Sequence, residues 1–214
     1  HWMDGIGPKS ARPVMRELAW QSIEPNQFGT EEYIRLCKKM GWTPMLTVNL
    51  GTGTPEEARN WVEYCNSPAG TRYSNLRAEN GSPDPHAVKL WCLGNEMDGP
   101  WQMEHKTATE YGRKACEAAK MMKWVDPTIE LVACGSSSDK MATMGHWESE
   151  VLQHCFDHVE YVSIHQYYGN PDNDTPGFLA RSEDMSDYID QIVATCDYVA
   201  ALKRSRKRIM LSFD

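Results

Sequence analysis

A carboxylate and an amide stand where an apolar run of this chain stops. Residues 88–102 read VKLWCLGNEMDGPWQ, and Asn95 and Glu96 follow directly on the apolar part. A carboxylate at the end of a buried strand is unfavourable unless it is solvated, paired or used in chemistry. Taken alone, Glu96 is explained better by a structural salt bridge or a loop cap than by catalysis, so its surroundings must decide.

Polar and aromatic groups accompany Glu96. Asn95 offers a donor and an acceptor suited to holding a hydroxyl, Trp101 follows close by, and HQYY at 165–168 ends another apolar run with His165 and Tyr167. An aromatic face suits a sugar ring, although core packing is the simpler role for any one tryptophan. Glycoside hydrolysis requires a carboxyl group that protonates the leaving oxygen and groups that hold the sugar. The combination therefore favours a glycosidase site.

Short apolar runs alternate with amphipathic runs along the chain, and they must position these residues. We expect strands at 44–51, 88–95, 129–136, 161–169 and 208–213, and helices at 30–40, 54–66, 108–125, 146–157 and 185–204. Thr54, Pro55 and Glu57 form a helix start with a capping box, and apolar residues then recur at helical spacing. The segments 66–87 and 169–184 are rich in Pro, Gly, Asn, Asp and Ser, so we expect long loops there.

Apolar strands separated by helices predict an α/β fold with a parallel sheet covered by helices. The alternation fits either a doubly wound sheet or a (β/α)8 TIM barrel. GTGT at 51–54 lacks the third glycine of a dinucleotide-binding turn, whereas polar residues follow several strands, at Asn49, Asn95, Ser136 and His165. Because barrels assemble their active sites at the carboxyl ends of the strands, we predict a barrel.

Composition excludes several kinds of partner. The formal charge of −8 argues against nucleic acid and against anionic membrane surfaces, and no window approaches the roughly 18 apolar residues of a membrane helix. The seven cysteines include no Cys-x-x-Cys pair, so we expect them to be buried and reduced, in a reducing compartment. The glycosylation sequons at Asn80 and Asn173 favour secretion instead. We expect a cytoplasmic protein, with secretion as the alternative.

Five blocks occur in order along the chain: DGIGPKSARP, ELAWQSIEPNQFGT, NLGTGTPEEARNWVEYCN, KLWCLGNEMDGPWQ and SIHQYYGN. Together they resemble the α-L-arabinofuranosidases of glycoside hydrolase family 51, over essentially the whole chain. The resemblance implies a (β/α)8 catalytic barrel beside a β-sandwich domain, with no metal and no cofactor. It also implies removal of terminal α-L-arabinofuranosyl groups from arabinan, arabinoxylan and related saccharides with retained configuration. A homo-oligomer is implied as well.

The resemblance assigns roles to individual residues. Glu96 matches the general acid/base, and Asn95 matches the asparagine that hydrogen-bonds the sugar. His165 and Tyr167 match residues that line the catalytic subsite. Aromatic residues around the aglycone are matched by two tryptophans, Trp20 and Trp101.

The second carboxylate of a retaining mechanism is expected directly after the block LSFD, which ends at Asp214. Asp214 itself is not a substitute, since its side chain would point to the opposite side of the strand from the next residue. We therefore expect residues 1–214 to be a partial (β/α)8 catalytic domain. It would lack the first strands, the last strand and the β-sandwich domain, and would be inactive alone.

Three alternatives stay open at this point. Another retaining barrel glycosidase, such as a xylanase or an endoglucanase, would share the Asn-Glu ending. A non-catalytic sugar-binding barrel would keep the aromatic residues without needing Glu96 beside a second carboxylate. A metal hydrolase would need a ligand pair such as His154 and His158, but histidines four apart on an expected helix are explained better by a solvated helix face.

Overall fold

Five parallel strands form the main sheet of the computed structural model, which describes residues 1–213. They are β3 (Met45–Thr47), β4 (Leu90–Cys92), β5 (Glu130–Cys134), β6 (Tyr161–Ile164) and β7 (Met210–Phe213). Their order in the sheet is their order in the chain, β3-β4-β5-β6-β7. All five expected strands are thus present and parallel, each within a residue of its predicted range or inside it.

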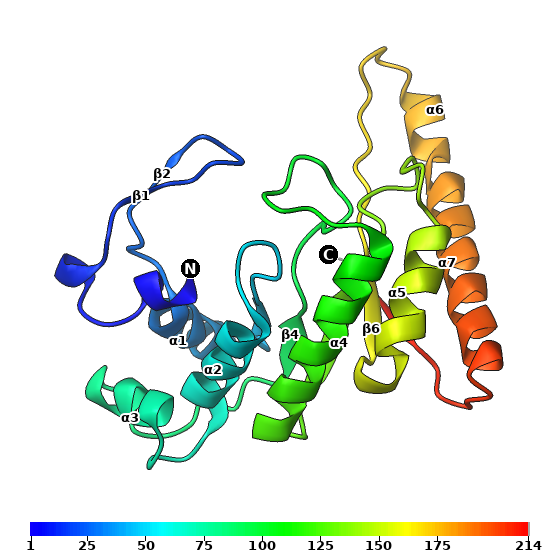
Figure 1. Ribbon diagram of the computed structural model, residues 1–214. Coiled ribbons are helices and arrows are strands. Elements are labelled where there is room, and N and C mark those ends of the chain that lie inside the picture. The colour runs from blue at the N-terminus through cyan, green and yellow to red at the C-terminus, as the bar shows by residue number, and fades with distance from the viewer. Residues whose placement is uncertain (214) are drawn as a thin grey trace.

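The helices lie on one face of this sheet (Figure 1). They are α1 (Thr30–Met40), α2 (Pro55–Asn66), α3 (Arg72–Glu79), α4 (Ala108–Val125), α5 (His146–Cys155), α6 (Thr175–Ala180) and α7 (Ser182–Leu202). Helix α2 packs against α4, α4 against α5, and α5 against α7. A doubly wound sheet reverses its strand order and carries helices on both faces, so the unbroken order with neighbouring helices in contact is that of a (β/α)8 barrel, as the sequence predicts.

Local sequence explains where the main helices start. Helix α2 begins with the predicted capping box, in which the Thr54 side chain accepts from the Glu57 amide at 3.1 Å and Glu57 accepts from the Thr54 amide at 2.7 Å. Thr107 and Glu110 repeat this arrangement at the start of α4. Each box satisfies amides that would otherwise lack partners, which sets the point where the chain leaves its strand-end loop.

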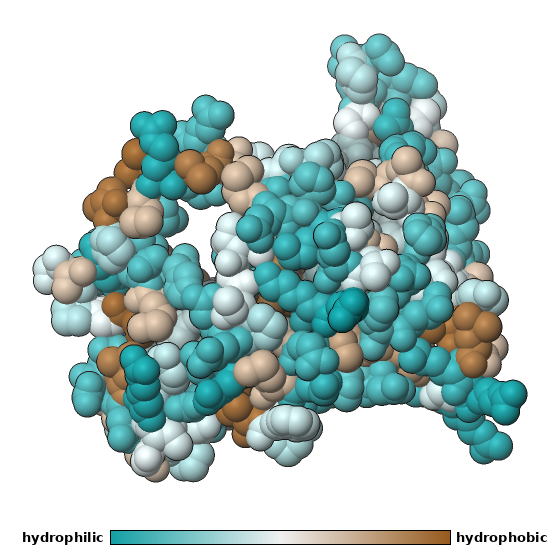
Figure 2. Space-filling model, in the orientation of Figure 1, coloured by the Kyte–Doolittle hydropathy of each residue, from teal (hydrophilic) through white to brown (hydrophobic). Residues whose placement is uncertain are grey.

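A short antiparallel hairpin, β1 (Met15–Arg16) with β2 (Ile23–Glu24), extends away from the helices on the side of the strand ends (Figure 1). The chain before it forms two 3-10 turns, Trp2–Gly5 and Lys9–Ala11. Apolar side chains of this arm are exposed, and Figure 2 shows them as brown atoms at its surface. The hairpin was not predicted from the sequence, because a strand of two residues is too short to show an alternation of apolar and polar residues.

The expectation of an unbroken loop over 66–87 is wrong, because α3 lies within it. Arg77 of this helix is fully buried, and its guanidinium donates to the carbonyl oxygens of Tyr64, Ser67, Ser82 and Pro83 at 2.6 to 3.2 Å. One buried cation thus hydrogen-bonds carbonyls at the end of α2 and in the segment after α3. Tertiary contact of this kind, rather than amphipathic periodicity, holds the helix in place.

The expectation of a loop over 169–184 also needs correction. Helix α6 occupies part of it, with the Asp174 side chain accepting from the Gly177 amide at 3.2 Å, and α7 begins at Ser182 rather than at 185. An N-cap aspartate before a proline in the first turn was a readable helix signal there.

Helix α1 is joined to the α3 segment by a buried carboxylate, Glu31. It accepts from the Tyr64 hydroxyl at 2.8 Å and the Ser82 hydroxyl at 2.6 Å, and it lies 2.9 Å from Nε2 of His86. Although burial raises its pKa, these hydrogen bonds and the charge of His86 bring the pKa of Glu31 down to about 2. The ionised form is therefore the one that the fold stabilises.

None of the seven cysteines, all within residues 1–213, forms a disulfide, and all but the half-buried Cys116 are buried, as predicted. Burial raises the pKa of the Cys134 thiol to about 12, so it is protonated and unreactive at neutral pH. Among residues 1–213, no helix has the length and apolar character needed to cross a membrane.

Candidate active site

Glu96 lies in the loop after β4, in a backbone conformation that few residues adopt. Its φ is +46°, in the left-handed region, and Gly94 just before it has φ +102°. The Gly99 amide closes the turn by donating to the Glu96 carbonyl at 2.9 Å. A positive φ costs free energy for a glutamate, so contacts with the surrounding residues must hold this conformation. Such conformations concentrate at functional sites.

Both oxygens of the Glu96 carboxylate have partners. Oε1 lies 3.1 Å from Nδ1 of His165, and Oε2 accepts from the Trp101 indole N–H at 2.5 Å. His165 follows β6, whereas Glu96 follows β4, so the curved sheet brings two non-adjacent strand ends together. The Glu96 side chain is only 12% exposed. This carboxyl group is fixed in direction, not a mobile surface charge.

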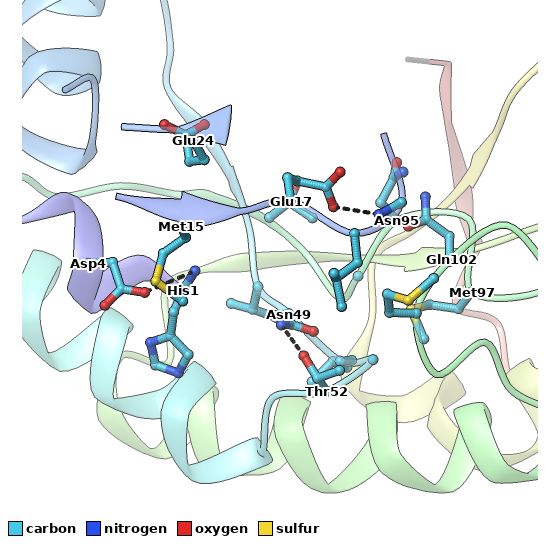
Figure 3. Close-up of a pocket in the computed structure, with 18 of the residues that line it drawn as sticks. His1, Asp4, Met15, Glu17, Glu24, Asn49, Thr52, Asn95, Met97 and Gln102 are labelled. Atoms are coloured by element: carbon cyan, nitrogen blue, oxygen red, sulfur yellow. Dashed lines mark hydrogen bonds and ion pairs between the residues drawn. The ribbon is translucent and has the colours of Figure 1, made fainter. Parts of the chain in front are cut away.

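Asn95 and Met97, the chain neighbours of Glu96, border a cavity of about 520 Å³, whereas Glu96 itself is not among the residues that line it. Figure 3 shows residues that line the cavity: the hairpin arm supplies Glu17 and Glu24, and the segments after β3 and β4 supply Asn49 and Asn95. Acids and amides are groups that hydrogen-bond sugar hydroxyls. The cavity therefore has the lining expected of a saccharide site.

The other two predicted aromatic residues are exposed. Tyr167 is 86% exposed and Trp20 is 75% exposed, and neither hydrogen-bonds Glu96 within the part of the chain that the structure describes. Trp20 lies on the arm beside Leu18 and Ala19, which do line the cavity. Of the six predicted residues, the structure brings three together, Glu96, His165 and Trp101, with Asn95 at the cavity edge.

Comparison with known proteins shows to which family the chain belongs. Residues 1–190 match the family model described as the alpha-L-arabinofuranosidase 1 domain. The chain belongs to the α-L-arabinofuranosidase family. The matched residues include both the hairpin arm and the strand ends around Glu96 and His165.

Two curated arabinofuranosidases match over all of the chain. The intracellular exo-alpha-(1->5)-L-arabinofuranosidase of Acetivibrio thermocellus is 56% identical and that of Bacillus subtilis 55%. A solved family 51 alpha-L-arabinofuranosidase from Bifidobacterium longum superposes on 100% of the chain with a TM-score of 0.96 at 40% identity. The chain spans 42% of the Acetivibrio relative and 43% of each of the other two. The resemblance to family 51 is thereby confirmed.

Asp98, two residues after Glu96, is predicted from the sequence only as part of a turn. It is buried and accepts from the Ser137 hydroxyl at 2.7 Å and the Ser137 amide at 3.1 Å. Burial raises the pKa of Asp98, the bonds from Ser137 lower it, and the neighbouring charge of Glu96 raises it again. Nothing in the sequence pairs residues 98 and 137, so only the fold reveals this contact.

The metal-hydrolase alternative depended on His154 and His158, which the structure places on and just after α5. His154 lies 3.3 Å from Glu150 Oε1, one turn away on α5, and burial lowers the pKa of His158. Within residues 1–213, no group of three or more His, Cys, Asp or Glu side chains is placed to hold a metal ion. The expectation about Asp214 lies outside the described residues.

Proposed function

We propose that these residues form the acid/base side of a retaining glycosidase that removes terminal α-L-arabinofuranosyl groups. The observation that carries the proposal is Glu96, whose two carboxylate oxygens are held by His165 and Trp101, and whose neighbour Asn95 lines a cavity that also holds acids and amides. Family membership supports the same reading, since the curated relatives are named exo-arabinofuranosidases. The substrate class is arabinan-type saccharides with terminal arabinofuranose.

In this mechanism Glu96 works twice. Its carboxyl group first gives a proton to the glycosidic oxygen while a second carboxylate attacks the anomeric carbon. Ionised Glu96 then takes a proton from the water that releases the sugar. The imidazole of His165 and the indole N–H of Trp101 hold the carboxyl group in one orientation through both steps, so that no reorientation is needed between them.

The names of the relatives also bear on location and linkage. Both curated relatives are named intracellular exo-alpha-(1->5)-L-arabinofuranosidases, and seven cysteines without a disulfide fit a reducing compartment. We infer a cytoplasmic enzyme that acts on arabinose-containing saccharides. A homo-oligomer, and the lack of nucleic-acid and membrane partners, stay predictions from the sequence.

The test uses the full product of the gene that encodes this chain. Glu96→Gln should lower kcat/KM for an unactivated arabino-oligosaccharide by about 10²- to 10⁴-fold, the usual contribution of a general acid. It should lower the first-step rate with a 4-nitrophenyl arabinofuranoside much less, because that leaving group departs without a proton. In Glu96→Ala, azide should restore turnover, since this small anion needs no general base to attack the intermediate.

The control is Glu56→Gln, an exposed glutamate near the start of α2, which should leave both rates unchanged. Equal losses on both substrates, with no response to azide, would show that Glu96 is not the acid/base. Binding of arabinosaccharides by the unmutated protein without any turnover would favour the sugar-binding alternative.

A further inference from the structure

The loop that carries Glu96 is attached to the neighbouring strand end at one buried point. Asp98 and Ser137 are 8% and 5% exposed, and their side chains and the Ser137 amide make two hydrogen bonds at 2.7 and 3.1 Å. Ser137 follows β5, the strand between those that present Glu96 and His165. The attachment therefore lies between the two halves of the proposed site.

The β5 end is itself held rigidly. The Ser136 amide donates to Glu148 Oε1 at 2.6 Å, and the Tyr188 hydroxyl donates to the Ser136 carbonyl at 2.8 Å. Glu148 and Tyr188, from α5 and α7, are each 1% exposed. Ser137 thus presents its amide and hydroxyl from a position that two helices fix.

The loop needs such an anchor. Glu96 is left-handed, and the turn from Glu96 to Gly99 is closed by one backbone bond. A glutamate in a free loop relaxes to negative φ, which would turn its carboxyl group away from His165 and Trp101. Asp98 lies inside this turn, so its bonds to Ser137 act directly on the backbone that sets the direction of Glu96.

We propose that Asp98 is a positioning residue, which through Ser137 holds Glu96 in the left-handed turn that aims its carboxyl group at the glycosidic oxygen. This inference rests on the proposed function of Glu96. Asp98 touches no reacting atom in this proposal. Its removal should therefore impair proton transfer and leave sugar binding largely intact.

The test compares variants of the full gene product on a 4-nitrophenyl arabinofuranoside and an unactivated arabino-oligosaccharide. Asp98→Asn keeps the shape and can still accept from the Ser137 amide, but its NH₂ group must then donate to the Ser137 hydroxyl, so both charge-assisted bonds to the carboxylate are lost. It should lower kcat/KM, which reports the first step, on the oligosaccharide at least tenfold more than on the aryl substrate, because the aryl leaving group departs without a proton. Ser137→Ala keeps the backbone bond and should act in the same direction by about fivefold, the size of one hydrogen bond.

A matched control exists at the other end of α4. Asp126 likewise accepts from an amide and a hydroxyl of one residue far from Glu96: its Oδ1 accepts from the Thr128 amide at 2.9 Å and the Thr128 hydroxyl at 2.6 Å, and its Oδ2 accepts from the Asn66 side chain at 2.8 Å. Asp126→Asn should leave the ratio of the two substrates unchanged. The double variant Asp98→Ala/Ser137→Ala should be no worse than Asp98→Ala alone, because both remove one contact.

The outcomes are distinguishable. Equal losses on both substrates, or an Asp98→Asn enzyme that behaves like Asp126→Asn, would overturn the positioning role while leaving the proposed function intact. If Asp98→Asn fails to fold, Ser137→Ala decides, and an unchanged substrate ratio in that variant overturns the role. An unmutated enzyme that releases no arabinose from either substrate would overturn the proposed function and this inference together.

Discussion

Replacing Glu31 by glutamine is expected to remove about 3 kcal/mol of stability at neutral pH. The pKa of Glu31 falls from 4.5 to about 2 on folding, and each pKa unit corresponds to about 1.36 kcal/mol. Glutamine keeps the shape of the side chain but cannot accept from Tyr64, Ser82 and His86 as an anion does. The loss is thus the charge-dependent part of this buried contact.

The sign of the pH dependence follows from the lowered pKa. The contribution is fully present above pH 4.5, where the unfolded carboxylate is ionised, and it declines as the pH falls toward about 2. About 2 kcal/mol of it should be gone by pH 3. The difference between the unmutated protein and Glu31→Gln should therefore shrink steadily over this range.

Urea unfolding of the full gene product at several pH values between 7 and 3 measures this difference. Glu56→Gln, an exposed change near the start of α2, should show no pH-dependent difference. A Glu31→Gln effect that is constant from pH 7 to pH 3 would refute the reasoning, because it would show a packing loss rather than the loss of an ionised group.

Three further changes test individual contacts. Trp101→Phe keeps the ring but removes the N–H that Glu96 accepts, so kcat/KM for arabino-oligosaccharides should fall about tenfold or more, measured by arabinose release. Arg77→Met leaves several buried carbonyls without their donor and should lower the free energy of unfolding by about 3 kcal/mol or more in urea; a smaller effect would mean that water replaces the guanidinium. Thr107→Ala removes one half of the α4 capping box with Glu110 and should lower stability by about 1 kcal/mol, whereas a change below 0.3 kcal/mol would show that the cap is dispensable.

Much of the fold was predictable because the relevant signals are local. Helix α4 spans Ala108–Val125, as its apolar spacing predicts, and α2 starts at the capping box of Thr54 and Glu57. The five strands are short apolar runs that end at polar residues, which is how barrel strands meet their active-site loops. Where a segment lacked such a period, as in α3, the prediction failed because a buried Arg77 holds the helix through carbonyls at the end of α2 and in the segment after α3.

The sequence by itself determined that Glu96 and Asn95 follow a buried strand and that His165 follows another. An apolar run that ends at polar residues is a property of neighbouring residues, so it can be recognised without the fold. Only the tertiary structure decided that Glu96 adopts a left-handed conformation, that it lies between His165 and Trp101, and that Asp98 is bonded to Ser137. The contacts with His165 and Ser137 join residues 69 and 39 positions apart, and they arise from the pairing of β4, β5 and β6 side by side, which no local pattern records.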